Sequence, residues 1–439
     1  MAVEQNSHWT YGYGPRTVVV VSALRLNPEP APPDAPELVG YRPDDSGYRR
    51  VIVALFAAGV ATFALIYSTQ ALLPEFPRAF DVSAAQSTLS VSLTTIGLGL
   101  ALLVAGPLSE VVGRTRLIHL SLTASAVVGV ACALAPTWHV LLGLRLLEGV
   151  TLAGLPAVAT AYLREELHPS THARAAGVYI GGTAIGGMTG RLVTGPIADV
   201  AGWRWALAAI AGVALVCAVV VRLLLPASRN FVPVPAAVGT LLAMARRAVG
   251  DRALLALYAI GACSIGAFVA VFNALGFRLT SAPFDLGLGG AGLVFLVYPI
   301  GTVGSMVAGR LAHRFSRRAV VPVGSLIALA GVLLTLFGSL PVIVAGVAVL
   351  TAGFFAVHGV ASGWVPARAH AGGVAAGQAA SLYLFAYYLG SSVFGSLTGQ
   401  AWSLAAWPGV VLLAGGLFVF TGLLALWLRR MPSLDPRLH

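Results

Sequence analysis

The sequence predicts an all-α integral membrane protein with twelve transmembrane helices in two pseudo-symmetric halves of six. Of its 439 residues, 58% are hydrophobic and only 10% are charged, whereas soluble domains carry roughly a quarter charged residues. Apolar runs of about 20 residues, the length that crosses a bilayer, recur from about residue 51 to residue 428. The distribution of arginine and a repeated glycine pattern then indicate how these runs are oriented and grouped.

Each apolar run is read as one helix, because a helix satisfies its own backbone hydrogen bonds inside lipid. The spans predicted for the first half are 51–74, 87–109, 117–136, 138–163, 173–200 and 204–225. Those predicted for the second half are 253–277, 288–312, 318–338, 341–365, 375–399 and 407–428. Pro136 and Pro341 mark junctions so short that the helices on either side form hairpins.

The spans divide the chain into five parts. They are an N-terminal tail (1–50), a first half (51–225), a connector (226–252), a second half (253–430) and a C-terminal tail (431–439). The N-terminal tail lacks helical periodicity, and its apolar piece TVVVVSAL is too short for a signal sequence. We therefore expect a disordered cytoplasmic tail.

Arginines indicate the orientation, because short basic loops stay in the cytoplasm. One set of loops, with both tails, holds Arg42, Arg49, Arg50, Arg114, Arg116, Arg164, Arg174, Arg229, Arg246, Arg247, Arg314, Arg317, Arg318, Arg368, Arg429 and Arg430. The alternate loops hold only Arg78, Arg204 and Arg278. Both termini are therefore expected in the cytoplasm of a multi-pass plasma-membrane protein, and the number of spans is even.

Composition also excludes several classes of protein. The net charge of +11 lies in loops between apolar spans, which does not favour a nucleic-acid partner. All 27 basic residues are arginine, so a Walker-type phosphate loop, which needs lysine, is excluded. Cys132, Cys217 and Cys263 fall singly in apolar spans, which is typical of core residues. We expect no metal, no cofactor and no enzymatic activity, because the sequence holds no catalytic triad, metal-ligand cluster or nucleotide fingerprint.

The two halves repeat each other. Glycines recur at a constant offset of 200, as Gly177, Gly190 and Gly195 against Gly377, Gly390 and Gly395. GPLSEVVGRTR, which starts at Gly106, likewise corresponds to GRLAHRFSRRA, which starts at Gly309. A repeat of six and six spans with a basic connector is typical of alternating-access transporters, whose site lies between the halves near the bilayer midplane.

Three motifs resemble signatures of the major facilitator superfamily. GPLSEVVGRTR is similar to the signature of the loop between spans 2 and 3. RLLEG (145–149) is similar to the signature of the fourth span, and GTAIGGMTGR (182–191) is similar to the antiporter signature of the fifth span. The combination looks most like the drug:proton antiporter-1 group, which includes arabinose-efflux-type permeases. Glu110 replaces the usual Asp, Glu148 replaces a usual Gln, and Gly187 and Arg191 replace the Pro and final Gly.

The resemblance implies a proton-coupled exporter of a small organic solute or drug, with a latch near the loop between spans 2 and 3. A helix N-terminus of the other half would attract Glu110, and Arg114 would pair with Glu165 or Glu166. The latch residues are Gly106, Glu110, Gly113, Arg114, Arg116, Glu165 and Glu166. The alternative is that the basic loop only fixes topology.

The antiporter-motif glycines, Gly182, Gly186, Gly187 and Gly190, allow close helix approach. They also fit a static packing face.

Arg145, Glu148 and Arg191 are the charges expected deep in the membrane. Arg145 and Glu148 are three residues apart and share a helix face, and counting residues from the span ends places Arg191 at nearly the depth of Glu148. A charge at the bilayer centre costs roughly 2.5–3.5 kcal/mol, so we expect all three to face the central cavity and one another. Burial away from water favours the neutral form of the Glu148 side chain, whereas a neighbouring arginine favours its ionised form. These opposing effects suit a group that is protonated in one state and ionised in the other, so Glu148 is the expected proton carrier. The alternatives are a static ion pair that fixes helix register, or an arginine that binds an anionic substrate.

Other polar residues within spans are weaker candidates for the substrate cavity: Tyr67, Gln70, Asn273, Tyr298, His358, Tyr383 and Tyr387. His358 is the next candidate for a proton site. The first span has no acidic residue, so neutral, sugar-like or anionic solutes fit the cavity at least as well as cationic drugs.

The expected partners are a small-molecule substrate, protons and the lipid bilayer, and we expect a monomer. The closest alternative is a sugar or metabolite carrier of the same fold that works as an importer or facilitator. A non-transporting membrane sensor is less favoured because the soluble stretches are short, and a channel is disfavoured by the intact repeat.

Overall fold

The computed structural model describes residues 40–231 and 238–431. The predictions for the first 39 residues and for residues 432–439 lie outside the described residues. Ten helices are long and apolar enough to cross a membrane. One of these, α15 (Ala376–Leu428), contains two helices joined at Ala405 and Ala406, which have non-helical backbone angles. With α7 (His172–Ala201), which is long but glycine-rich, the described chain has twelve spans.

The first half contains six spans, and apart from α1 their ends lie within a few residues of those predicted. They are α1 (Ser46–Tyr67), α3 (Ala84–Val112), α4 (Arg114–Ala133), α5 with α6 (Trp138–Leu152, Gly154–Glu166), α7 (His172–Ala201) and α8 (Trp203–Leu224). Three short helices, η1 (Gln70–Leu72), α2 (Phe76–Phe80) and η2 (Pro169–Thr171), lie in the connections. The helix α1 packs against α7 and α8, while α5 packs against α3 and α4.

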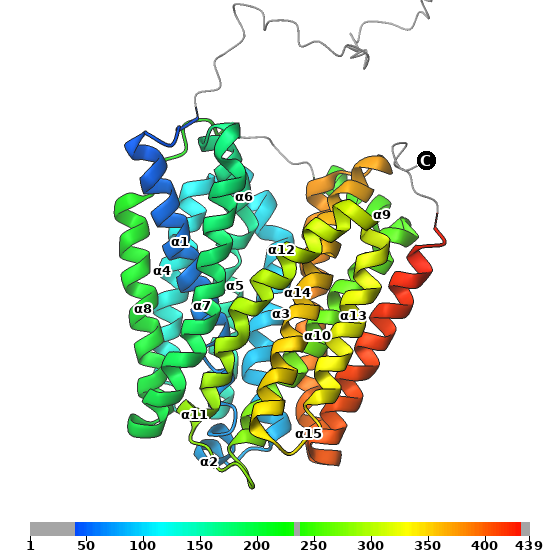
Figure 1. The fold of residues 1–439 in the computed structure, drawn as a ribbon. Helices are drawn as coiled ribbons and strands as arrows, with labels where there is room; N and C mark the ends of the chain where they lie inside the picture. The colour runs from blue at the N-terminus through cyan, green and yellow to red at the C-terminus, as the bar shows by residue number, and fades with distance from the viewer. Residues whose placement is uncertain (1–39, 232–237, 432–439) are drawn as a thin grey trace, which may run out of the picture. The chain divides into compact units, whose positions relative to one another are not determined.

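The second half follows the helix α9 (Val238–Gly250) of the connector. Its spans are α10 (Arg252–Leu279), α11 with η3 and α12 (Leu288–Gly292, Leu293–Val297, Tyr298–Phe315), α13 (Arg317–Leu334), α14 (Leu340–Ala371) and the two parts of α15. The helix α10 packs along α15, and α14 packs against α12 and α13. Figure 1 shows the two groups of helices side by side.

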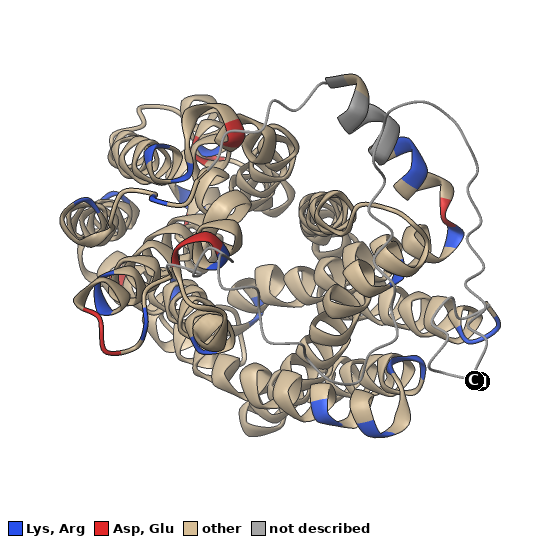
Figure 2. Cartoon of the chain, turned by 90° about the horizontal axis from the view of Figure 1, so that it is seen from above, with Lys and Arg blue, Asp and Glu red and all other residues tan. Residues whose placement is uncertain are grey.

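We call the end of the bundle where α1 begins and α15 finishes the termini end, and the end that carries α2 and α11 the hairpin end (Figure 1). Figure 2 looks onto the termini end and shows arginines and acidic residues mainly on helix ends and in loops. The long apolar stretches between the two ends form four buried hydrophobic clusters.

Prolines and polar residues interrupt three of the spans. Pro156 has no N–H to bond to the Leu152 carbonyl, and α5 ends at Leu152. Pro299, at the start of α12, likewise has no N–H to bond to the carbonyl of Phe295 in the preceding 3₁₀ turn η3. The first span was predicted to continue to residue 74, but α1 ends at Tyr67 and the 3₁₀ turn η1 follows. This break places Gln70 outside regular helix.

The internal repeat is visible in the backbone. Gly113 (φ 96°, ψ 146°) begins α4, and Ser316 (φ 101°, ψ 149°) begins α13 with the same conformation, 203 residues later. Gly202 (φ 84°) and Ala406 (φ 48°) likewise precede the last helix of each half. The two halves therefore share unusual turn geometry, although only the first half has glycine at both positions.

The halves contact each other at the hairpin end. The Ser392 hydroxyl donates to the Ser92 carbonyl (2.8 Å), between α15 and α3. A Cβ placed on Gly195 of α7 would lie 2.7 Å from the Leu288 carbonyl oxygen. At the termini end, a Cβ on Gly177 or on Gly377 would meet no atom within 4 Å among the described residues. The helix α7 is thus closely packed against the other half at Gly195, whereas a Cβ on Gly177 near its other end would meet open space among the described residues.

Candidate functional site

Arg191 of α7 lies where the two halves meet. It is 1% exposed, and it donates from Nε to Gln70 Oε1 (2.5 Å) and from Nη1 to the Gly187 carbonyl (2.8 Å). Its guanidinium carbon lies 4.0 Å from the ring centre of Tyr67, 4.6 Å from that of Tyr298 and 4.8 Å from that of Phe295. Cation–π attraction of about 0.5–2 kcal/mol per contact stabilises a guanidinium in such a site.

Gln70 extends the network from Arg191 into the second half. Its Nε2 donates to Asn273 Oδ1 of α10 (2.6 Å), and Asn273 Nδ2 donates to the Gly395 carbonyl of α15 (3.4 Å). We call this series, from the Gly187 carbonyl through Arg191, Gln70 and Asn273 to the Gly395 carbonyl, the polar chain. Because Gln70 and Asn273 are both buried, breaking a bond between them leaves polar groups without water, at a cost of about 1–3 kcal/mol per group.

A group of aromatic side chains continues from Tyr298 into the second half. Tyr298 packs edge-on against Phe355 (6.1 Å between ring centres). His358 lies next, with Nδ1 3.0 Å from the Tyr383 hydroxyl and its ring 4.7 Å from that of Tyr387. His358 and Tyr387 are only half-buried, so these two polar rings are the accessible part of the group.

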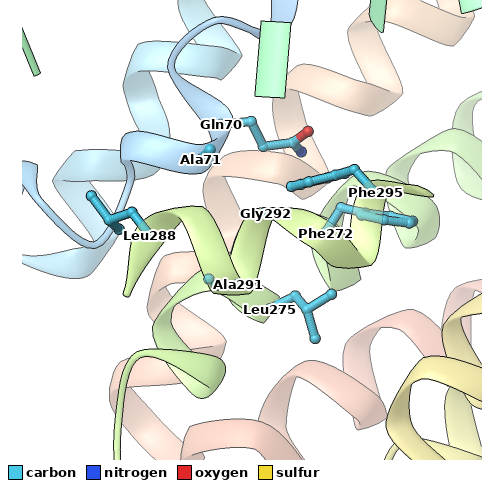
Figure 3. Close-up of a pocket in the computed structure, with 9 residues that line it drawn as sticks. Gln70, Ala71, Phe272, Leu275, Leu288, Ala291, Gly292 and Phe295 are labelled. Atoms are coloured by element: carbon cyan, nitrogen blue, oxygen red, sulfur yellow. The ribbon is translucent and has the colours of Figure 1, made fainter. Parts of the chain in front are cut away.

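An apolar pocket adjoins the polar chain (Figure 3). Its lining comes from η1, α10 and the α11–η3 segment: Gln70, Ala71, Phe272, Leu275, Gly276, Leu288, Ala291, Gly292 and Phe295. The pocket therefore shares Gln70 and Phe295 with the surroundings of Arg191. It lies between the halves, where their relative movement would change its size.

Arg145 and Glu148 form an ion pair inside the first half. Arg145 Nη1 donates to Glu148 Oε2 at 2.5 Å, and the two side chains are 0% and 1% exposed. The Cys132 thiol of α4 lies 3.7 Å from the same oxygen. The predicted contact of Arg145 with Glu148 is confirmed, and Glu148 lies on the side of α5 that faces α4.

The remaining donors of Arg145 hold the end of α1. Nη2 donates to the Ile66 carbonyl (2.9 Å), and Nη1 to the Leu65 carbonyl (3.1 Å) and to the Ser68 hydroxyl (3.1 Å). Nε donates to the Ser90 carbonyl of α3 (3.0 Å). The last carbonyls of a helix have no partner within it and carry partial negative charge, so Arg145 stabilises the point where α1 stops.

The prediction that Arg191 joins Arg145 and Glu148 in one central cavity was wrong. Arg145 and Glu148 bond to α1, α3 and α4, all in the first half, whereas Arg191 bonds to Gln70 at the boundary. Among the residues that the structure describes, Glu148 and Arg191 thus belong to separate networks. Counting residues gives depth along a span but not direction around it: α7 packs against α1 and α8, and α5 packs against α3 and α4.

The antiporter-motif glycines pack against α1. A Cβ on Gly182, Gly186 or Gly190 would collide with the backbone of α1 at Phe56, Val60 or Ala64. A Cβ on Gly187 would instead lie 3.4 Å from Arg191 Nη1. Three of these glycines therefore allow close helix packing, and the fourth leaves room for the Arg191 side chain.

The predicted latch residues meet at the termini end of the first half. Arg114 Nη2 pairs with Glu110 Oε1 (2.7 Å) and with Glu165 Oε1 (3.0 Å). The pairing with Glu165 confirms one of the two predicted partners. The other, Glu166, accepts from the backbone N–H groups of Arg229 (2.7 Å) and Asn230 (3.2 Å) at the start of the connector.

Two further latch residues differ in their surroundings. Arg116 is exposed, and a Cβ on Gly106 would meet no atom within 4 Å among the described residues. The helix N-terminus of the other half that was expected to attract Glu110 is not its partner among the described residues, because Glu110 bonds to Arg114. In this conformation Arg114 pairs with Glu110 and Glu165 of its own half, and Glu166 bonds to the connector.

Sequence reasoning missed three residues of the interface. Phe272 and Phe295 were treated as ordinary apolar residues, and nothing in their spacing marks them. Asp199, at the hairpin end of α7, accepts from the backbone N–H groups of Leu288 and Gly289, both at 2.8 Å. In the sequence, Asp199 closely precedes the Gly-Trp at the start of the next span. That pattern marks the end of a helix, but it does not identify the residues of the other half that Asp199 binds.

Two six-helix halves with a polar boundary between them are typical of membrane transport proteins built from two repeats. The family profile described as Major Facilitator Superfamily matches residues 52–394, and the chain belongs to that superfamily.

Relatives agree with this assignment. The chain is 40% identical over 381 residues to "Uncharacterized MFS-type transporter YybF" of Bacillus subtilis, covering 87% of this chain and 93% of the relative. It is 41% identical over 363 residues to "Inner membrane transport protein YnfM" of Escherichia coli, covering 83% and 86%. The fold is similar to a bacterial homologue of the human lysosomal transporter Spinster in an inward-facing, unoccupied conformation, with a TM-score of 0.72, 16% identity and coverage of 89% and 98%.

Proposed function

We propose that the protein is a proton-coupled exporter that moves a small organic solute out of the cytoplasm by alternating access. The halves, residues 51–225 and 253–430, would move against each other about the connector 226–252, with both termini in the cytoplasm. The excess of arginine in the loops of the termini end supports this orientation. The conformation described would then be open toward the cytoplasm.

The observation that carries the proton coupling is the connection from Glu148 to the polar chain. Glu148 is a fully buried carboxylate within a span, paired with Arg145. Arg145 also holds the Ile66 carbonyl and the Ser68 hydroxyl, and Ser68 lies two residues before Gln70. Protonation of Glu148 would remove the charge that Arg145 balances, so the end of α1 and the position of Gln70 would respond.

The similarity of the fifth span to the antiporter signature supports export over import. Solute would bind from the cytoplasm at the boundary near Arg191 and the half-buried His358 and Tyr387. Proton binding at Glu148 from the outside would then drive the return of the empty carrier. An importer of the same fold would show the opposite relation between proton and solute flux.

Purified protein in proteoliposomes with an imposed pH gradient tests this proposal against a panel of sugars, dyes and organic anions. We expect gradient-dependent solute movement in the wild type, with protons moving opposite to the solute, and loss of the gradient dependence in Glu148→Gln. Glu75→Gln, the same change in the α2 region, is the control and should behave as wild type. If Glu148→Gln remains driven by the gradient, Glu148 is not the proton carrier, and protons moving with the solute would indicate import.

A further inference from the structure

The charge balance at the boundary between the halves is incomplete. The charge of Arg145 is balanced by Glu148. Arg191 is just as deeply buried, yet the ion pairs of the described residues, on Arg114, Arg145 and Arg368, do not include it. A charge at such depth costs roughly 2.5–3.5 kcal/mol even on the lenient insertion scale. An arginine without a counter-ion is therefore unfavourable for packing alone.

The partners of Arg191 hold its side chain without neutralising it. Gln70 Oε1, the Gly187 carbonyl and the Tyr298 hydroxyl are neutral acceptors, and they occupy three of the five guanidinium N–H groups. The three surrounding rings, Tyr67, Phe295 and Tyr298, attract the cation but supply no negative charge. Such a site has a fixed positive charge and remaining donors for a bidentate acceptor.

We infer that the transported solute is an organic anion, a carboxylate on an apolar ring, whose carboxylate pairs with Arg191. The inference rests on the proposed transport function and specifies its substrate class. Tyr67, Phe295 and Tyr298 would contact the ring of the solute. The pocket beside these rings, whose lining is apolar apart from Gln70 (Figure 3), favours an apolar rather than a polyhydroxyl body.

The same geometry opposes cations and gives little advantage to neutral solutes. A cation beside Arg191 would meet a like charge in a medium of low dielectric constant, where repulsion is strong. A neutral amide would form hydrogen bonds but would leave the charge of Arg191 unbalanced. The site therefore selects by charge as well as by shape.

Binding is tested on the purified full-length protein without a pH gradient, by the ligand-dependent rise in thermal stability. The probes are benzoate, phenylacetate and cyclohexanecarboxylate, each compared with its neutral amide. We expect at least one acid to bind tenfold or more tightly than its amide. If no acid binds better than its amide, the inference is overturned.

Two variants place the charge selection at Arg191. Arg191→Gln removes the cation, and Gln70→Glu puts a carboxylate at the atom that lies 2.5 Å from Arg191 Nε. Each should weaken binding of the acid at least tenfold and change binding of the amide much less, so that the preference for acid over amide is lost. Gln70→Glu keeps Arg191 and supplies an internal counter-ion, which offsets the lost hydrogen bond from Gln70 Nε2 to Asn273 Oδ1. It should therefore fold even if Arg191→Gln unfolds, and its melting temperature without ligand checks this. Arg174→Gln, which removes an exposed positive charge from the same helix, is the matched control and should bind as wild type.

The outcomes separate this inference from the proposed transport function. Full binding of the acid by folded Gln70→Glu or Arg191→Gln protein would overturn the inference, whatever the result in the pH gradient. Acid-selective binding that depends on Arg191 supports the inference. This holds even if the Glu148→Gln variant transports solute in the pH gradient as the wild type does and the coupling proposal fails.

Discussion

Asp199 offers a direct test of how the closed end of the transporter is held. It is an exposed residue at the hairpin end of α7, and its two carboxylate oxygens accept from the backbone N–H groups of Leu288 and Gly289 at 2.8 Å each. These are the bonds by which the first half holds the start of α11 in the second half. We expect Asp199→Asn to weaken this closure and shift the protein toward the conformation that is open at the hairpin end.

The magnitude follows from the lost interactions. Asparagine keeps one acceptor oxygen and loses the charge, so one bond disappears and the other becomes neutral. A hydrogen bond to a charged group contributes about 1.5–3 kcal/mol and a neutral one about 0.5–1.5 kcal/mol. The lower ends of these ranges sum to about 2.5 kcal/mol for the two changes. Because water competes at this exposed residue, we expect a smaller net loss of about 1–2 kcal/mol, which changes the ratio of the two conformations about 5- to 30-fold.

Distances between spin labels measure that ratio. Val200 and Leu404, which are 86% and 87% exposed, accept labels on opposite halves after Cys132, Cys217 and Cys263 are replaced by alanine. The longer-distance population should grow 5- to 30-fold relative to the shorter one in Asp199→Asn. Asp285→Asn, the same change at an exposed residue just before α11, should leave the distribution unchanged. An unchanged distribution in Asp199→Asn would refute the assignment of Asp199 to this closure.

Three further predictions concern stability, read from the melting temperature of the purified protein. Ser316→Gly should stabilise the protein by about 1 kcal/mol, because φ of 101° strains a side-chain-bearing residue; a drop in melting temperature would contradict this. Gly186→Ala should destabilise it clearly more than Gly187→Ala, because only the first would collide with the backbone of Val60; equal effects would rule out the packing role. Arg145→Gln should lower the free energy of unfolding by about 3–5 kcal/mol, because it leaves Glu148 buried and unpaired. The double variant with Glu148→Gln should recover part of that loss, and no recovery would show that Arg145 acts through its carbonyl contacts alone.

Hydropathy was sufficient to predict the helices because a span must be apolar over its whole length. The repeat was equally accessible, since glycines at a fixed offset mark equivalent turns and contacts. The break after Tyr67 was not predictable by these means. The 3₁₀ turn of Gln70, Ala71 and Leu72 is too short to interrupt the apolar span Ser46–Leu72. Its position depends on the carbonyls that Arg145 binds from another span.

The site was predicted residue by residue but not as an arrangement. Tyr67, Gln70, Asn273 and Tyr298 were each named from their polarity, and the structure brings all four to Arg191 or to its partner Gln70. Which arginine lies at the boundary depends on the rotation of each helix about its axis. A single sequence indicates that rotation only when one face of the helix carries a hydrophobic stripe. Spans that are apolar all round have almost no such stripe.

The separation of the two buried arginines has a mechanistic consequence. A carboxylate next to Arg191 would cancel the charge that an anionic solute needs, so a proton site in direct contact with it would compete with the solute for one cation. Glu148 instead pairs with Arg145. Within the part of the chain that the structure describes, the short segment from Leu65 to Gln70 links the two networks. Coupling between proton and solute would then be conformational: each ligand would act on the other by changing where this segment lies. Shortening or stiffening that segment should therefore uncouple the two fluxes without abolishing either binding event.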